Sequence, residues 1–77
     1  MSQAERHLRK RSFSLAGHRT SVALEPEFWA ALEAAAGRRG LSLAALVAEL
    51  DAARATTGVP LASALRVFAL GECVSAS

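Results

Sequence analysis

The most informative pattern in the chain is a short alternation of apolar and polar residues from Thr20 to Leu24. Val22 and Leu24 fall on one face of an extended segment, and Ser21 and Ala23 fall on the other. The pattern predicts a strand of five residues. A lone strand leaves its backbone donors and acceptors unpaired, so we expect its partner strand to come from a second copy of the chain.

A second alternation lies upstream, where Phe13 and Leu15 are flanked by serines. If the chain ran extended without interruption to Leu24, these two side chains would face opposite to Val22 and Leu24. Gly17 can adopt a positive φ and so reset the face by a bulge or a turn. We expect an extended or bulged continuation rather than a closed hairpin.

A first helix is predicted to begin at Pro26 and to end near Gly37. Proline suits the first helical position because its fixed φ is helical and its missing amide is not needed there. Phe28 and Leu32 recur at helical spacing and are expected to form the buried stripe. Trp29 lies off the centre of that stripe, so we expect it to cover the edge of the core or the partner subunit rather than to stack on bases.

A second helix is predicted after Gly40, with Ser42 as its N-cap. Its apolar residues follow i, i+3, i+4, i+7 spacing, at Leu43, Leu46, Val47 and Leu50. Burying each of these side chains is worth about 1.5–3 kcal/mol. A monomer that left this stripe half exposed would lose much of that free energy, which again favours a dimer.

A third helix is predicted over residues 61–70, after a break at Gly58 and Pro60. Its apolar stripe consists of Leu61, Leu65 and Phe68. Arg66 lies off this stripe, so the helix is expected to pack on the other two helices and not to bind DNA. Residues 71–77 are expected to form a frayed tail.

The composition places this pattern in one small domain. A chain of 77 residues buries a low fraction of its surface, so dimerisation is a natural route to a sufficient core. No apolar run approaches the roughly 20 residues of a membrane span, and the N-terminal residues are basic rather than apolar as in a signal peptide. These features predict a soluble, cytoplasmic protein without a membrane partner.

Charge is concentrated at one end of the chain. Residues 1–20 carry five basic residues against one acid, whereas the remainder carries four against six. Residues 1–10 are expected to form a disordered basic arm that neutralises nucleic-acid phosphates. A solubilising terminus without such a role is the alternative.

The residue types needed for catalysis or metal binding do not occur in a useful arrangement. Ser, His, Asp and Cys have no nucleophile–base spacing, which argues against an enzyme. His18 has no second ligand at metal-binding spacing, and Cys73 is the single cysteine and is expected to be a spare thiol. We therefore expect no catalytic residues, no metal and no cofactor.

The order of these segments resembles the ribbon-helix-helix domain of the Arc and methionine repressors over about Arg19 to Ala55. The residues that carry the resemblance are Thr20-Ser21-Val22-Ala23-Leu24, Glu25-Pro26-Glu27-Phe28 and Gly40-Leu41-Ser42. A narrower resemblance, to a compact bacterial subfamily of ribbon-helix-helix proteins, runs from Arg11 to Leu70. Its segments are Arg11–Ser21, Leu24–Trp29 and Ser63–Phe68.

The resemblance implies a mainly α fold with a short β ribbon, forming an intertwined homodimer, with an added C-terminal helix and a domain spanning residues 11–70. The paired strands would enter the DNA major groove, with Arg19, Ser21 and Ala23 facing the bases. The DNA backbone would meet Gly40, Leu41, Ser42, Leu43 and the basic residues Arg6, Arg9, Lys10 and Arg11. The dimer core would comprise Val22, Leu24, Phe28, Leu32, Leu43, Leu46, Val47 and Leu50.

The expected function is that of a dimeric DNA-binding transcriptional regulator, a repressor acting on double-stranded DNA. The ribbon, however, offers one Arg, one Ser and one Ala where good base readers are Arg, Lys, Asn and Gln. The alternative is a protein-interaction module, an antitoxin or adaptor that keeps the fold and binds another protein. A salt titration against duplex DNA distinguishes the two.

Overall fold

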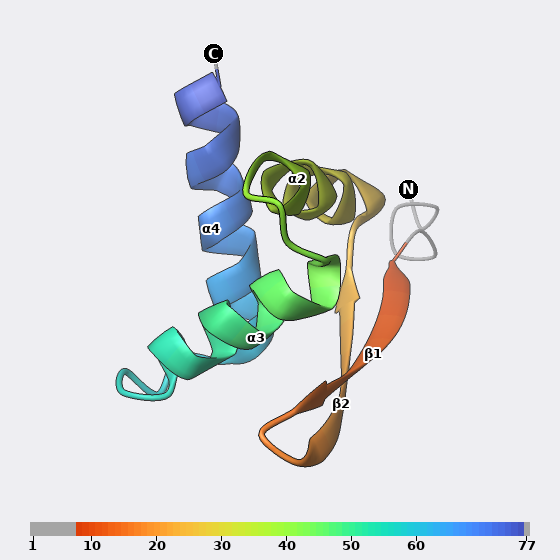
Figure 1. Ribbon diagram of the computed structural model, residues 1–77, viewed down its shortest axis with the longest axis vertical. Coiled ribbons are helices and arrows are strands. Elements are labelled where there is room, and N and C mark those ends of the chain that lie inside the picture. Colours follow the sequence, from red (N-terminus) through yellow and green to blue (C-terminus); the bar gives the residue numbers. More distant parts are fainter. Residues whose placement is uncertain (1–7, 77) are drawn as a thin grey trace.

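The computed structural model describes residues 8–76 and contains a two-stranded antiparallel ribbon followed by three helices (Figure 1). In this view the strands lie to the right, α4 to the left, α2 above and α3 below, and α4 also packs against β2. Within the described residues, no helix is long and apolar enough to cross a membrane. The bounds of the elements are β1 Arg9–Leu15, β2 His18–Leu24, α2 Pro26–Arg38, α3 Leu43–Arg54 and α4 Leu61–Ala76.

Strands β1 and β2 form a closed hairpin, in register from Leu15 opposite His18 to Arg9 opposite Leu24. The two loop residues have positive φ, 51° at Ala16 and 82° at Gly17, as a type I′ turn requires. The expectation of an extended or bulged continuation was therefore wrong. The premise that β2 needs a strand from a second copy was wrong too, because β1 of the same chain supplies one.

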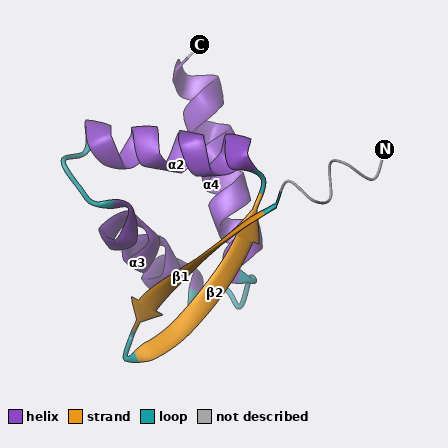
Figure 2. Ribbon diagram, turned by 90° about the vertical axis from the view of Figure 1, so that its right-hand side faces the viewer, coloured by secondary structure: helices purple, strands orange, loops and turns teal. Residues whose placement is uncertain are grey.

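The hairpin explains how Phe13 and Leu15 can share a face with Val22 and Leu24, because the turn reverses the direction of the chain. In the register of this hairpin, each odd-numbered residue of β1 lies opposite an even-numbered residue of β2. Two residues that lie directly opposite each other point to the same face of the sheet. Phe13 and Leu15 thus share the inner face with Val22 and Leu24, and all four are buried against the helices. Figure 2 shows the ribbon crossing in front of the helices that cover this face.

The helix ends follow the capping chemistry expected from the sequence. Gly40 adopts φ 70° after α2, and the Leu41 amide returns to the Ala36 carbonyl at 2.9 Å, as in a Schellman motif. Ser42 caps α3, with its Oγ accepting from the Ala45 amide at 3.0 Å. The sharp turn between the two helices is thereby fixed by local hydrogen bonds.

The inner stripe of α2 differs from the predicted one. Trp29, not Phe28, is buried, with 2% of its surface exposed, while Phe28 is half-buried. The indole Nε1 donates to the Arg9 carbonyl at 2.8 Å, and the ring centroid lies 5.9 Å from that of Phe13. Trp29 therefore joins α2 to the first strand at the centre of the core.

A single chain covers the stripe of α3 better than we expected. Leu46 and Val47 are fully buried, and Leu43 and Leu50 are half-buried. The cover comes from α4, which packs against α2, α3 and β2. We expected a monomer to leave this stripe half exposed, but Leu46 and Val47 at its centre are buried within one chain.

Helix α4 is longer than predicted and uses a slightly different face. It continues to Ala76 instead of ending at Leu70, so most of the segment that was expected to be a frayed tail is helical. Its buried residues are Leu61, Leu65 and Ala69, with Phe68 half-buried. At the other end, Arg9 and Lys10 belong to β1, so the folded domain begins before residue 11.

Candidate nucleic-acid interface

The face of the ribbon that points away from the helices is made of exposed, mostly polar residues. The register places Lys10 opposite Ala23, Ser12 opposite Ser21 and Ser14 opposite Arg19. We call these six residues the outer ribbon face: Lys10, Ser12, Ser14, Arg19, Ser21 and Ala23, all exposed. The structure thus brings the three predicted base-facing residues together on one surface, and their contact with DNA stays a prediction.

Ser12 and Ser14 were not predicted on this surface, because their position depends on closure of the hairpin. The signal that could have found them is the pair of alternating apolar segments, Phe13 and Leu15 before Gly17 and Val22 and Leu24 after it, which share a face only if the chain reverses. Ser12 Oγ and Ser21 Oγ lie 3.0 Å apart and share a hydrogen bond across the strands. The outer ribbon face is therefore a flat, small-residue surface from which only Lys10 and Arg19 project as long side chains.

These two charges lie at opposite ends of the ribbon. Arg19 sits beside the turn, opposite Ser14, whereas Lys10 lies four residues from Ser14 along β1. A strand advances about 3.3 Å per residue, so the two cationic positions are roughly 13 Å apart. No acidic residue lies on this face, so both charges act on an approaching anion without local neutralisation.

Apart from Arg9 and Arg19, the arginines of the described chain are held in ion pairs. Arg11 Nη1 lies 2.7 Å from Glu33 Oε2, and its guanidinium carbon lies 5.1 Å from the Trp29 ring centroid. The helical arginines likewise pair with acids, as Arg38 and Arg39 with Glu72, Arg54 with Asp51, and Arg66 with Glu25. Within the described residues, Arg9, Lys10 and Arg19 are the cations outside such pairs, and all three belong to the ribbon.

The Glu25–Arg66 pair ties the end of β2 to α4. Hydrogen bonding from the backbone of Glu25 itself and from Arg66 holds the pKa of the Glu25 carboxyl below its ordinary value. Arg66 also lies over the Phe28 ring, with its guanidinium carbon 5.9 Å from the centroid. Arg66 thus contacts Glu25 and Phe28 of the same chain, and the packing role expected for it stays a prediction.

The basic residues that were predicted to bind the DNA backbone do not all lie on the outer ribbon face. Arg6 lies outside the described residues. Arg9 and Arg11 belong to the inner side of the hairpin, where a phosphate contact by Arg11 would compete with Glu33. Of the predicted arm residues that the structure describes, only Lys10 stands on the outer ribbon face.

The start of α3 keeps the features of an anion-binding helix end. Gly40 and Ser42 are exposed, and Leu41 and Leu43 are half-buried, so these apolar residues would present backbone rather than side chain. Because the Ser42 hydroxyl serves the Ala45 amide, the amides of Leu43 and Ala44 keep no intrahelical partner. Two such amides and the helix dipole can hold a phosphate oxygen.

The described residues contain no group of three or more His, Cys, Asp or Glu that could hold a metal ion. His18 is exposed at the hairpin turn, next to Arg19. Its ring is free to make a polar contact there.

Comparison with known proteins identifies the class to which this arrangement belongs. Residues 8–73 match the family described as "Ribbon-helix-helix domain". The chain therefore belongs to the ribbon-helix-helix family, whose members generally act as DNA-binding regulators or antitoxins. No curated protein and no solved structure gives a significant match.

Proposed function

We propose that the protein is a dimeric DNA-binding transcriptional regulator whose outer ribbon face enters the major groove. One observation carries the proposal: the cations outside ion pairs, among the described residues, all lie on the ribbon. An exposed surface that carries unpaired cationic side chains and no acidic residue attracts phosphates. An arginine that is paired with a carboxylate contributes little to this attraction. In this proposal the regulator acts as a repressor in the cytoplasm.

The hydrogen-bonding pattern of the hairpin supports pairing with a second copy. In a two-residue hairpin the pair beside the turn, Leu15 and His18, is hydrogen-bonded, and bonded pairs then alternate along the strands. The backbone groups of Arg19, Ser21 and Ala23 therefore point to the other edge of β2. No strand of the described chain pairs with that edge.

Antiparallel pairing of two β2 strands would be centred on Ser21. Strand β2 spans His18–Leu24, so a two-fold axis at its midpoint pairs the whole strand and sets Arg19 opposite Ala23 of the second copy. It also keeps the two Arg19 side chains from facing each other directly. The result is a four-stranded sheet in which both copies contribute Arg19 to one surface.

The width of this sheet suggests how it would divide its contacts. Neighbouring strands lie about 4.8 Å apart, so the two β1 strands would be separated by about 14 Å, against a major groove about 12 Å wide. The central β2 pair would enter the groove, and the β1 strands would lie against the phosphates. Arg19 would read guanine, Ala23 could contact a thymine methyl, and Lys10 would neutralise phosphate.

Two substitutions on the same face test this division. Arg19→Ala is expected to cut the preference for the best site, by about 1–3 kcal/mol per half-site, and to leave most non-specific affinity. Lys10→Ala is expected to weaken binding to all sequences and to flatten the slope of log affinity against log salt. Arg54→Ala, which removes a cation that is paired with Asp51 at the C-terminal end of α3, is the matched control and should change neither quantity.

The measurement is a salt series on matched and scrambled duplexes, after selection of a site from random DNA. The regulator proposal fails if the parent protein does not bind duplex DNA below about 100 μM, the weak limit for non-specific binding at physiological salt. The protein-interaction module, antitoxin or adaptor, would then take its place. That alternative is favoured by the single long base-reading side chain per copy, Arg19.

A further inference from the structure

Helix α4 has almost no charge, although one of its faces is open to solvent. Of its 16 residues, only Arg66 and Glu72 are charged. Arg66 pairs with Glu25 at 3.1 Å, and Glu72 pairs with Arg38 and Arg39. Both charges are therefore directed to neighbouring elements of the same chain, and the open face of α4 carries neither.

The open face presents a ridge of apolar side chains. Val67 is 68% exposed and Leu70 is 54% exposed, and both lie on the side of the helix opposite Leu65. With Ser63 they follow spacings of four and three residues, the spacing of a helix–helix seam. A helix that is apolar on all sides is usually covered on all sides.

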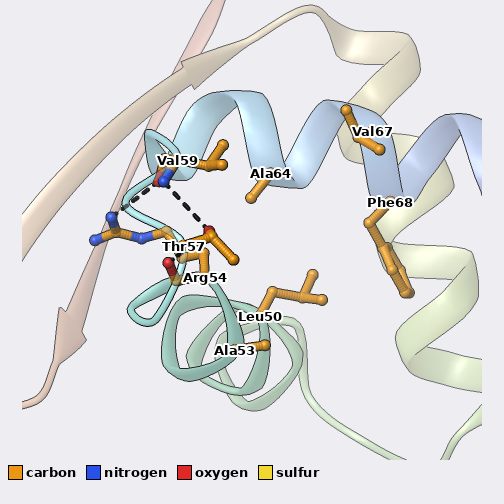
Figure 3. Close-up of a pocket in the computed structure, with 8 residues that line it drawn as sticks. All are labelled: Leu50, Ala53, Arg54, Thr57, Val59, Ala64, Val67 and Phe68. Atoms are coloured by element: carbon orange, nitrogen blue, oxygen red, sulfur yellow. Dashed lines mark hydrogen bonds between the residues drawn. The ribbon is translucent and has the colours of Figure 1, made fainter.

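A groove runs alongside this ridge, between the end of α3 and α4 (Figure 3). Its volume is about 360 Å³. Its apolar lining is formed by Leu50, Ala53, Val59, Ala64, Val67 and Phe68. Val67 therefore belongs to both the ridge and the lip of the groove, and Val59 at the far end is 38% exposed.

The two polar residues of the groove already have partners. Arg54 pairs with Asp51 at 2.8 Å and donates to the Val59 carbonyl at 3.1 Å. The Thr57 hydroxyl donates to the Arg54 carbonyl at 2.9 Å and accepts from the Val59 amide at 3.3 Å. A small-molecule site needs polar groups that fix the orientation of the ligand, and a nucleic-acid site needs unpaired cations. This groove offers neither.

We propose that the ridge and groove of α4 form a self-association surface whose occupant is a second copy of this chain. The ridge is uncharged and has helical spacing, and the groove beside it is mostly apolar, with its one charged residue, Arg54, paired with Asp51. The two features therefore complement each other across a two-fold axis. With the axis near Val67, antiparallel α4 helices place Leu70 of each copy over Ala64 of the other. Each ridge then lies in the groove of the opposite copy, as in an antiparallel helix bundle.

This surface is separate from the free edge of β2. Helix α4 packs against β2 through its buried side, whereas Val67 and Leu70 lie on the other side of the helix, so the two interfaces use different surfaces. Two β2-paired dimers joined through α4 would make a tetramer with two DNA-binding surfaces. This last consequence rests on the proposed function, and bivalent attachment would raise the apparent affinity for adjacent sites. The α4 contact itself does not depend on DNA binding.

The test removes the β2 contact first and then asks whether association survives. Ser21→Pro deletes an amide on the free edge of β2 and should leave the α4 interface intact. We expect this variant to be a dimer, twice the chain mass of 8.0 kDa, by sedimentation at about 10–100 μM, a range typical of weak self-association. Adding Val67→Glu should halve that mass, because two carboxylates would meet near the axis.

Ala34→Glu in the same Ser21→Pro background is the matched control, since Ala34 is exposed on α2 and adds the same charge elsewhere. It should leave the dimer unchanged. Circular dichroism checks that each variant is folded, and Leu70→Glu, at a second exposed position of the ridge, should reproduce the effect of Val67→Glu. The proposal is overturned if Ser21→Pro alone is monomeric, or if Val67→Glu and Ala34→Glu give the same mass. Failure of the parent protein to bind duplex DNA, while the α4 dimer of Ser21→Pro persists, would instead contradict the proposed function alone.

Discussion

At the residue scale, Trp29 and Phe28 exchange the roles that the helical spacing suggested. A stripe through Phe28 and Leu32 is nearly as regular as one through Trp29 and Leu32, so periodicity alone decides poorly between adjacent aromatics. Contact with β1 decides in favour of Trp29, whose indole N–H finds the Arg9 carbonyl and whose ring packs near Phe13. Phe28 is left half-buried beneath the Arg66 guanidinium.

Alanine substitution at the two positions should therefore have unequal effects. We expect Trp29→Ala to lower the free energy of unfolding by about 3–5 kcal/mol, the usual loss for a buried aromatic, and Phe28→Ala by less than half of that. Urea denaturation at several protein concentrations measures both losses. Equal losses that grow with concentration would show that a partner subunit buries Phe28, as the predicted dimer core requires.

At the element scale, the hairpin changes what each strand can still do. One edge of β2 is occupied by β1. Among residues 8–76, no strand pairs with the other edge of β2 or with the outer edge of β1, so two edges are open to another strand. Ser12 and Ser21 are directly paired, are the same residue type, and have their amides on these two outer edges. Substitutions at these two positions can therefore show which outer edge of the hairpin pairs with a second copy of the chain.

Proline at each of the two positions should separate the edges. Both substitutions remove one amide from an outer edge and the shared hydroxyl hydrogen bond, and neither removes a backbone hydrogen bond between β1 and β2. We expect Ser21→Pro to abolish the association that depends on β2, and Ser12→Pro to leave it intact. Cross-linking of the two variants in the Val67→Glu background, where α4 no longer contributes, provides the measurement. Equal cross-linking in both would argue against pairing through β2.

At the scale of the whole molecule, α4 completes a core that the ribbon and two helices leave open. Leu61, Leu65 and Ala69 are buried, and the helix touches α2, α3 and β2. Each buried leucine contributes about 1.5–3 kcal/mol, which is a large part of the roughly 5–15 kcal/mol that stabilises a typical domain. Helix α4 is therefore expected to be indispensable for stability.

Truncation after Thr57 tests this role. A loss of 3 kcal/mol or more would lower the melting temperature by roughly 12 °C or more, since about 1 kcal/mol corresponds to 4–8 °C in a domain of this size. Thermal unfolding followed by circular dichroism gives the comparison with the full chain. A truncated protein that melts like the full chain but no longer binds DNA would reverse the assignment, making α4 part of the DNA interface.

The sequence by itself determined the elements that depend on local chemistry. Pro26 and Ser42 begin two helices, Gly40 ends one, and the alternation at Val22 and Leu24 makes a strand, because these features need only a residue and its near neighbours. The ribbon-helix-helix family followed from their order, and the family match confirms it. The grouping of Arg19, Ser21 and Ala23 on one exposed face followed from alternation alone.

Only the tertiary structure decided which surfaces face each other. Closure of the hairpin depends on packing Phe13 and Leu15 beside Val22 and Leu24 under the helices, so the turn could not be chosen from its two residues alone. The pairing of Arg11 with Glu33 likewise joins residues distant in the chain, and a phosphate contact by Arg11 would have to compete with it. The spacing of apolar residues indicates which face of a helix or strand can be buried. Which residues are buried and which charges pair depends on how the other elements pack against that face, and sequence spacing does not determine that packing.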